Sequence, residues 1–418
     1  MSRSHGETVA SAESTLVIDY LRLGLAFDRI EEGFVDAFTG DPELRAEVQA
    51  APAPEPARLA DTARGLLADL PGDLDDDRAA FIAAHLRALE CSARKFAGED
   101  IGFVDEVRAY FDVDIALGDT DDYRAAHGQL AAALGVEGTT GAQLTDAYAA
   151  YRRADEIPAD RVDECVREFS GALREKVREA YPLPDSEIVD FEVVTDKPWS
   201  GFNYYLGGYR SRVAINVDLT QHMSNLPHLI AHEAYPGHHT EHCRKEQRLV
   251  GGGQTEQTIF LVNTPQCLMA EGLADHALGA IIGPEWGTWA AEIYADLGLR
   301  FDGERAQRVS RATAGLLGVR QDAALLLHDQ HADTDTVAAF LQRWLLAPEP
   351  RARQMLRFLT SPLWRAYIST YVEGYRLLQR WLDSSAPGIA GADRSARFGR
   401  LLDEPLIPAS LRAELGES

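Results

Sequence analysis

Positively charged side chains are scarce in this chain. Its 418 residues include 41 lysines and arginines against 66 aspartates and glutamates, which gives a formal net charge of −25. Phosphate backbones are bound by a stripe of basic side chains, and nothing in the sequence supplies one. We therefore expect no nucleic-acid partner, and we interpret the acidic excess as a source of solubility.

Cysteines and long apolar runs are also few. The four cysteines are widely scattered and form no CxxC pair, so neither a thiolate metal site nor a thioredoxin-like motif is indicated. In a chain of this length they are typical of reduced thiols. The first residues lack the apolar segment of a secretory signal, and no apolar run reaches the length of a membrane span. We expect a cytoplasmic protein without a membrane partner.

What the chain has in abundance is helical periodicity. Apolar residues three and four apart run through residues 13–180, and the same pattern returns after Leu219. Between them, residues 187–218 alternate β-branched and polar residues around Gly207 and Gly208, which predicts a small sheet with a hairpin. We predict a mainly α fold in one domain over residues 1–418, with metal-site helices at 224–282 and C-terminal helices at 283–415.

Six of the twelve histidines lie within residues 222–242. The apolar residues Leu226, Leu229 and Ile230 predict that a helix packed on a core leads into the cluster. His232 and Glu233 then stand side by side on that helix. Such a pair is typical of zinc hydrolases, in which an imidazole binds the metal and the neighbouring carboxylate takes a proton from water.

The position of the second histidine ligand depends on a helix break. A regular helix would place that ligand at position 236, which is a proline followed by Gly237. If the break absorbs two extra residues, His238 takes the place of the i+4 ligand, and we favour it over His239 at i+7. Two further pairs, His228/His232 and His238/His242, have i, i+4 spacing and remain alternatives.

A third ligand is expected from the segment TPQCLMAEGLADHALGAII. Thr264 and Pro265 predict the start of a helix in which Glu271 lies among apolar residues. A carboxylate in such surroundings must be paired, protonated or bound to a cation. Asp275 follows one turn later, where its carboxylate and that of Glu271 would repel each other. This repulsion would be relieved if Glu271 bound a zinc ion and Asp275 formed a hydrogen bond with a ligand histidine. The alternative is a solvent-exposed face or a salt bridge to arginine.

The two motifs HEAYPGHH (232–239) and AEGLADHA (270–277) resemble the bacterial domain-of-unknown-function 885 family of the thermolysin-like gluzincin superfamily. Weaker matches extend over most of the chain, and Leu273 stands where the family has tryptophan. The resemblance implies a large helical gluzincin-like metallopeptidase fold with a small sheet beside the active-site helix. It also implies one zinc ion, held by His232, His238 and Glu271, with Glu233 as general base and acid.

We predict a zinc metallopeptidase that cleaves small peptides. The alternatives are a hydrolase of non-peptide amides or esters and a non-catalytic protein with a structural metal. A tetrahedral oxyanion needs a donor besides the metal, and Tyr371 and His328 are the candidates. The strand RVAINVD (212–218) could pair with an extended peptide. The remaining candidates for substrate binding are Tyr205, Tyr209 and Arg210, and either Arg210 or Arg212 could hold a substrate carboxylate. Asp275 and His239 are the candidates for support of the ligands.

Overall fold

The computed structural model describes residues 4–70, 74–195, 201–384 and 393–417. Over these residues the chain is mainly helical with a small amount of sheet, as the sequence predicts. Residues 196–200, which belong to the predicted β region, lie outside the described residues. Over the described ranges, no helix combines the length and the apolarity needed to cross a membrane.

Helices make up the N-terminal half. They are α1 (Ser4–Phe27), α2 (Pro42–Ala50), α3 (Pro56–Ala68), α4 (Asp76–Phe96), α5 (Phe103–Phe111), α6 (Thr120–Leu134), α7 (Gly141–Ala154), η1 (Ala159–Arg161) and α8 (Val162–Ala180). One short strand, β1 (Val35–Phe38), interrupts them and pairs antiparallel with β5 (Ile259–Leu261), far along the chain. The helical periodicity of the sequence did not reveal this pair.

The predicted β region forms a three-stranded sheet of β2 (Ile188–Val194), β3 (Gly201–Gly207) and β4 (Arg210–Asn216). The strand order is β2-β4-β3, with β4 parallel to β2 and joined to β3 by the expected hairpin. Tyr209 occupies the turn with a φ of 63°, beside two glycines that also have positive φ. Because β4 is the central strand, both of its edges are already paired, so the prediction that it pairs with a substrate is wrong.

The inner face of this sheet packs on the two helices that carry the histidine cluster. These are α9 (Leu226–Glu233) and α10 (His238–Lys245), which continues into η2 (Glu246–Val250). Val213 and Ile215 of β4 are fully buried on this face, whereas Arg210 and Arg212 reach solvent on the other. The alternation of buried and exposed side chains along β4 thus determines which face of the sheet packs against the helices of the histidine cluster.

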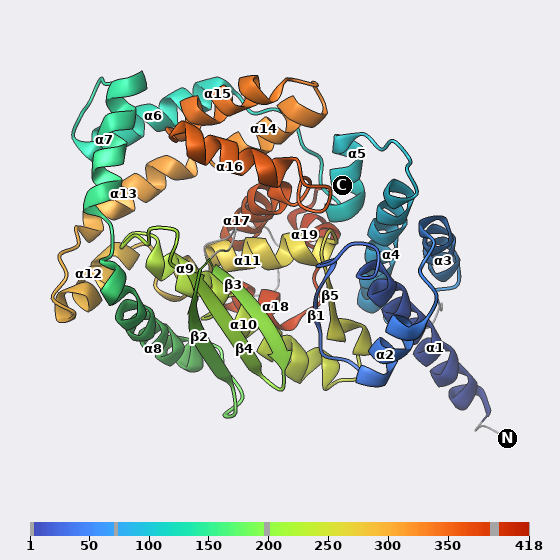
Figure 1. The fold of residues 1–418 in the computed structure, drawn as a ribbon. Coiled ribbons are helices and arrows are strands. Elements are labelled where there is room, and N and C mark those ends of the chain that lie inside the picture. The colour runs from blue at the N-terminus through green and yellow to red at the C-terminus, as the bar shows by residue number, and fades with distance from the viewer. Residues whose placement is uncertain (1–3, 71–73, 196–200, 385–392, 418) are drawn as a thin grey trace.

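Helix α11 (Pro265–Ile281) runs through the middle of the molecule (Figure 1). It starts after Thr264 and η3 (Thr255–Thr258), but the hydroxyl of Thr264 donates to the carbonyl oxygen of Leu261 and does not cap the helix. Nearly every side chain of α11 up to Leu278 is buried, which an amphipathic surface helix would not show. Polar groups on α11 therefore need partners inside the protein.

The remaining helices follow α11 in the chain. They are α12 (Trp286–Asp296), α13 (Gly303–Ala314), α14 (Val319–His328), α15 (Thr334–Leu345), α16 (Glu349–Leu359), η4 (Thr370–Gly374), α17 (Tyr375–Asp383), α18 (Arg394–Asp403) and α19 (Pro408–Leu415). In Figure 1, α14 to α16 lie above α11 and the three-stranded sheet lies below it. The four cysteines are all buried and free.

Candidate metal centre

The break between α9 and α10 brings His232 and His238 together. α9 ends at Glu233, the Tyr235–Pro236 peptide is cis, and α10 begins at His238. The N–H of Gly237 bonds to the carbonyl of Ala231 six residues earlier, at 2.8 Å, where a regular helix would bond four residues earlier. The break therefore absorbs two residues, as predicted, and the two imidazole rings lie 4.7 Å apart between centroids.

Two contacts fix the geometry of the break. A Cβ atom at Gly237 would lie 1.9 Å from the carbonyl oxygen of His232, so only glycine fits there. From the sheet, the side-chain amide of Asn203 donates to the carbonyl of Glu233 at 2.6 Å. This bond takes up a carbonyl that the broken helix leaves without a helical partner.

Glu271 approaches both histidines from α11. Its Oε2 lies 3.3 Å from Nε2 of His232, and its Oε1 lies 3.9 Å from Nε2 of His238. One ligand atom from each of the three residues lies within 4.8 Å of the others. Ligand atoms around a tetrahedral zinc ion are roughly 3.4 Å apart when each bond is about 2.1 Å. Small side-chain movements therefore suffice for all three to bind one ion.

Asp275 and Tyr367 form hydrogen bonds with two of these three residues. Oδ1 of Asp275 lies 3.1 Å from Nδ1 of His232, which leaves Nε2 of that ring facing Glu271. The sequence predicted this role for Asp275. The hydroxyl of Tyr367 donates to Oε1 of Glu271 at 2.6 Å, a contact that was not predicted from the sequence. Metal-binding histidines are usually hydrogen-bonded to a carboxylate or carbonyl, and metal-binding carboxylates usually accept a hydrogen bond from a neighbouring donor.

The electrostatics of the site favour positive charge. Burial alone would lower the pKa of His232, but the hydrogen bond with Asp275 and the nearby Glu271 carboxylate outweigh it and raise that pKa well above its usual value. Burial acts in the opposite sense on Glu271, yet the His232 and His238 rings lower the pKa of its carboxyl group. The carboxylates thus stabilise a cation at this place, whether a proton or a metal ion.

One oxygen shows that the donor set suits a metal. Oε2 of Glu271 is buried and takes part in no hydrogen bond among the described residues, although Nε2 of His232 is close to it. A buried carboxylate oxygen without a partner costs free energy. Two imidazoles and one carboxylate are the donors of catalytic zinc sites, and a zinc ion would bind this oxygen directly. The residues therefore fit the zinc ion that the sequence predicts.

Glu233 lies beside this cluster and is itself buried. A Cβ atom at Gly201, the first residue of β3, would come within 3.3 Å of its Oε1. Burial raises the pKa of Glu233, while the charges of His232 and His238 lower it. A carboxyl group with a raised pKa next to a metal site is suited to exchange protons near neutral pH.

Tyr371 reaches the same site through a close helix contact. A Cβ atom at Gly272 of α11 would lie 2.7 Å from the backbone of Gly374, so the two glycines allow η4 to lie directly on α11. Burial raises the pKa of Tyr371 well above its usual value, and the charges of Glu271 and Asp275 raise it further. The hydroxyl therefore keeps its proton and remains a hydrogen-bond donor.

His239 does not support the metal ligands, which corrects the prediction. Its Nδ1 lies 2.9 Å from the hydroxyl of Ser211, and its Nε2 lies 3.1 Å from Glu187. Both ring nitrogens are thus used to tie α10 to the sheet side. The alternative pairs are not formed either: His228 packs against the Trp286 ring, and His242 stacks on Tyr205.

His328 is also wrongly predicted as an oxyanion donor. Its Nε2 donates a hydrogen bond to the carbonyl oxygen of Leu359 at 2.7 Å, and it bonds to none of the described site residues. The ring packs on Phe103 with 5.1 Å between centroids. His328 therefore joins α14 to α16 and α5 and has a structural role.

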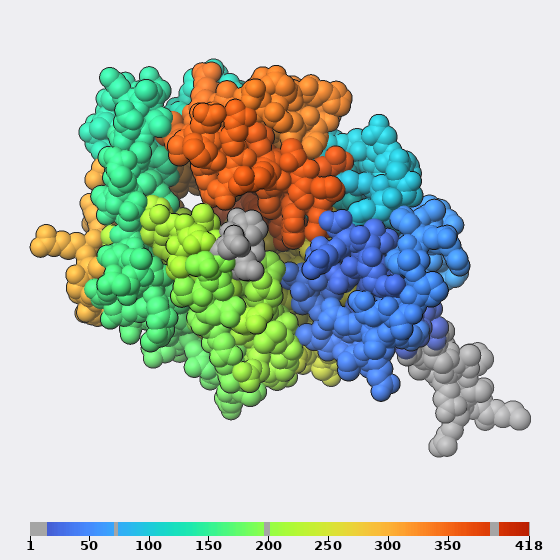
Figure 2. Space-filling view, in the orientation of Figure 1, coloured from blue at the N-terminus to red at the C-terminus, as the bar shows by residue number. Residues whose placement is uncertain are grey.

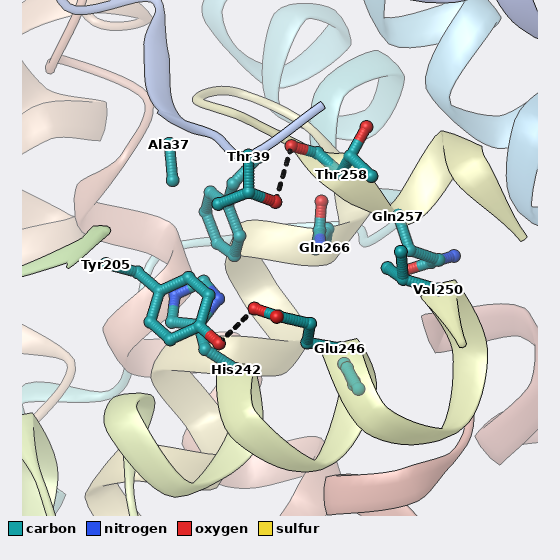
Figure 3. A pocket seen from close by; sticks show the side chains of 11 residues that line it. Ala37, Thr39, Tyr205, His242, Glu246, Val250, Gln257, Thr258 and Gln266 are labelled. Carbon is teal, nitrogen blue, oxygen red and sulfur yellow. Dashed lines mark hydrogen bonds between the residues drawn. The ribbon is translucent and has the colours of Figure 1, made fainter. Parts of the chain in front are cut away.

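The predicted substrate-binding residues do not face the cluster. Tyr205 donates to the Glu246 carboxylate inside a small cavity of about 20 Å³, with room for about one water molecule (Figure 3). Arg210 lies on the outer face of the sheet, 3.2 Å from Asp190. It starts β4, whereas Ile215, opposite Gly201, lies roughly 17 Å further along the strand. Arg210 and the neighbouring Tyr209 are thus at the far end of the sheet from Glu233.

Two charged residues near the site were not found by sequence reasoning. Asp36 of β1 has a pKa raised to about 7, by burial and then by the charges of Glu271 and Glu233. Arg320 of α14 interacts with Tyr371 and Asp275. Neither residue lies in a motif, and both come from segments far from the histidine cluster.

Comparison with known proteins is informative for the fold. No family model matches the chain, and no curated protein matches its sequence. A solved structure described as a putative lipoprotein from Colwellia psychrerythraea matches with a TM-score of 0.52 and 15% identity, over 89% of this chain and 68% of that chain. At this identity the likeness shows a shared fold, and no more.

Two other solved structures are more distant in shape. One is a putative lipoprotein of unknown function from Shewanella oneidensis, with a TM-score of 0.49 and 14% identity over 94% of this chain and 69% of that chain. The other is an M32 carboxypeptidase from Deinococcus radiodurans R1, with a TM-score of 0.41 and 15% identity over 99% of this chain and 95% of that chain.

Proposed function

We propose that this protein is a zinc-dependent hydrolase, a metallopeptidase that cleaves small peptides and is related to the domain-of-unknown-function 885 family. The observation that carries the proposal is the meeting of His232, His238 and Glu271, one ligand atom each within 4.8 Å, with Glu233 beside them. Two imidazoles, one carboxylate and a neighbouring glutamate form the set that metal-assisted hydrolysis needs.

When bound, the zinc ion supplies Lewis acidity, which activates water near neutral pH and polarises the substrate carbonyl. Glu233 accepts the proton of the attacking water and delivers it to the leaving amine. Asp275 keeps His232 in the tautomer that presents Nε2 to the site. Tyr371 donates a hydrogen bond to the developing oxyanion.

One edge strand of the three-stranded sheet begins next to Glu233. β3 is an edge strand of its sheet, and its first residue, Gly201, lies against the Glu233 side chain. Pairing with this edge would hold the backbone of a peptide in line with the site. β3 thus takes the role that the sequence had assigned to β4.

Replacement of Glu233 by glutamine tests the proposal. The variant keeps the size of the side chain but not its proton affinity, so we expect peptide cleavage to fall by at least about 100-fold. Zinc content and melting temperature should stay at the wild-type values. Wild-type protein that is loaded with zinc and cleaves no member of a peptide library, or a variant that keeps full activity, contradicts the proposal.

The hydrolysis of non-peptide amides or esters would use the same ligands. A panel of matched peptide, ester and aryl-amide substrates separates these activities. A structural metal would show differently, because its removal by a chelator would unfold the protein. In the proposed enzyme most of the core lies outside the site, so the metal-free chain should remain folded.

A further inference from the structure

A turn at residues 362–367 brings Tyr367 to the metal centre. The hydroxyl of Tyr367 donates to Oε1 of Glu271 at 2.6 Å, so the position of the turn decides whether this bond forms. Within the turn, the N–H of Tyr367 bonds to the carbonyl of Trp364 at 3.1 Å. A turn lacks the continuous backbone hydrogen bonds of a helix. Its place therefore depends on contacts from other segments.

Glu106 of α5 binds this turn through Arg365. The guanidinium of Arg365 donates to Oε2 of Glu106 through Nε at 2.9 Å, and through Nη2 as well. The other oxygen, Oε1, accepts from the ammonium of Lys95 at the end of α4, which also donates to the carbonyl of Pro362 at 3.0 Å. The space-filling view shows the segment around α5, in cyan, against the segment that follows α16, in orange (Figure 2). One carboxylate thus joins α4 and α5 to the turn.

The burial of Glu106 makes the turn depend on its charge. Its side chain is fully buried, whereas those of Lys95 and Arg365 remain 16% and 23% exposed. Water therefore cannot take the place of the carboxylate between its two partners. Loss of its charge would leave two neighbouring positive charges without their counter-ion. Their repulsion would push Arg365 away from Lys95, and Tyr367, two residues further on, would move with it.

Tyr367 tolerates little displacement. A hydrogen bond is lost when donor and acceptor separate beyond about 3.5 Å, so a shift of roughly 1 Å is enough to break its bond to Glu271. A further contact on the turn joins the side-chain amide of Asn263 to the carbonyl of Leu363 at 2.9 Å. Leu363 is further from Tyr367 along the chain than Arg365 is. The contact of Asn263 therefore cannot replace the one that Arg365 makes.

We propose that Glu106 is a positioning residue for the metal centre. Through Arg365 it holds Tyr367, and Tyr367 in turn orients the Glu271 carboxylate toward the ion. The inference rests on the proposed zinc-dependent function and adds a residue, on a distant helix, that determines how tightly the ion is held. Without the bond from Tyr367, the carboxylate can rotate away from the position in which it shares one ion with the two histidines.

Zinc affinity in a double-mutant cycle tests the inference. Glu106→Gln keeps the size of the side chain and loses its charge, so we expect zinc affinity to fall by roughly 3- to 10-fold. Tyr367→Phe removes the hydroxyl through which Glu106 acts, so Glu106→Gln should cause no further loss when it is added to Tyr367→Phe. Competition with a chromophoric chelator measures wild type, both single variants and the double variant. Losses that multiply in the double variant would overturn the inference.

Glu256→Gln is the matched control. Glu256 of η3 is also fully buried, and its carboxylate accepts hydrogen bonds from the guanidinium of Arg78 at 2.8 and 2.9 Å. Both glutamine variants should melt at a lower temperature than wild type, because each leaves a buried cation without its partner. Only Glu106→Gln should also lose zinc affinity. A structural role alone would not separate the two variants in this way.

Arg365→Met is a second variant that breaks the same contact. It keeps an apolar stem and leaves Glu106 paired with Lys95, so the protein should fold and lose as much zinc affinity as Glu106→Gln. Wild-type zinc affinity in folded Glu106→Gln or Arg365→Met protein, or an equal loss in Glu256→Gln, would overturn this inference alone. Wild-type protein that binds no zinc would overturn the hydrolase proposal as well.

Discussion

The hydroxyl of Tyr367 donates to Oε1 of Glu271 at 2.6 Å, across 96 residues of sequence. The bond leaves the other carboxylate oxygen, Oε2, free to face Nε2 of His232. Tyr367 thus fixes which oxygen of Glu271 is offered to a metal ion. Both groups are buried, so water does not compete for the bond.

Replacing Tyr367 by phenylalanine tests this role. The variant loses the hydrogen bond but keeps the ring, so we expect zinc affinity to fall by roughly 10-fold. Competition with a chromophoric chelator measures the change. Tyr371→Phe is the control, because the Tyr371 hydroxyl forms no hydrogen bond with a ligand oxygen among the residues that the structure describes. It should keep wild-type zinc affinity and lose about 100-fold in kcat. Equal zinc affinity in wild type and Tyr367→Phe would refute the role given to Tyr367.

The contact between α11 and η4 depends on a missing side chain. Gly272→Ala would place a Cβ atom 2.7 Å from the backbone of Gly374 and push η4 away from α11. We expect a loss of about 1–3 kcal/mol in the free energy of unfolding and reduced activity, since Tyr371 moves with η4. Gly279→Ala on the same helix meets nothing within 4 Å. It should stabilise the protein by about 0.5–1 kcal/mol. Urea unfolding of the two variants measures both effects, and a stabilised Gly272→Ala protein would show that the contact is not required.

Glu187 makes stability depend on pH. Burial alone would raise its pKa, but hydrogen bonds from His239, Arg174, Tyr235 and Arg178 outweigh it and lower the pKa from the usual 4.5 to about 2. A lowered pKa in the folded state stabilises the protein above pH 4.5, and this contribution is lost as the pH falls from about 4.5 to 2. It amounts to about 3 kcal/mol at most.

The Glu187→Gln variant measures this contribution by difference. Its free energy of unfolding should lie below that of wild type at pH 7, and the gap should close as the pH approaches 2. Denaturant unfolding at a series of pH values gives both curves. A gap that is the same at pH 7 and pH 3 would show that the charge of Glu187 contributes nothing.

Local sequence was enough to predict that His232, His238 and Glu271 lie together. Pro236 and Gly237 stand where a regular helix would carry the second histidine, so counting residues across the break predicted His238. Asp275 was predicted because two carboxylates one turn apart on a buried helix need a positive partner. Both arguments use forces that act over a single helical turn.

Residues that approach from distant segments could not be predicted in the same way. Tyr367, in the turn before η4, contacts Glu271, and Asp36 of β1 and Arg320 of α14 interact electrostatically with residues of the site. All three depend on tertiary packing that no periodicity encodes. Arg210 was assigned to the substrate because it lies close to the cluster in sequence. The direction in which β4 runs places it at the far end of the sheet. The strand order, likewise, puts β3 and not β4 at an edge of the sheet.

The central claim is that one metal ion binds jointly to α9, α10 and α11, and zinc content per chain tests it most directly. Protein that has been stripped, reloaded with zinc and desalted is analysed by mass spectrometry. We predict one zinc ion per chain for wild type and for His331→Ala, an exposed histidine outside the site, and much less than one for His238→Ala and Glu271→Ala. Zinc retained at the wild-type level by both ligand variants, while they remain folded, would contradict the account.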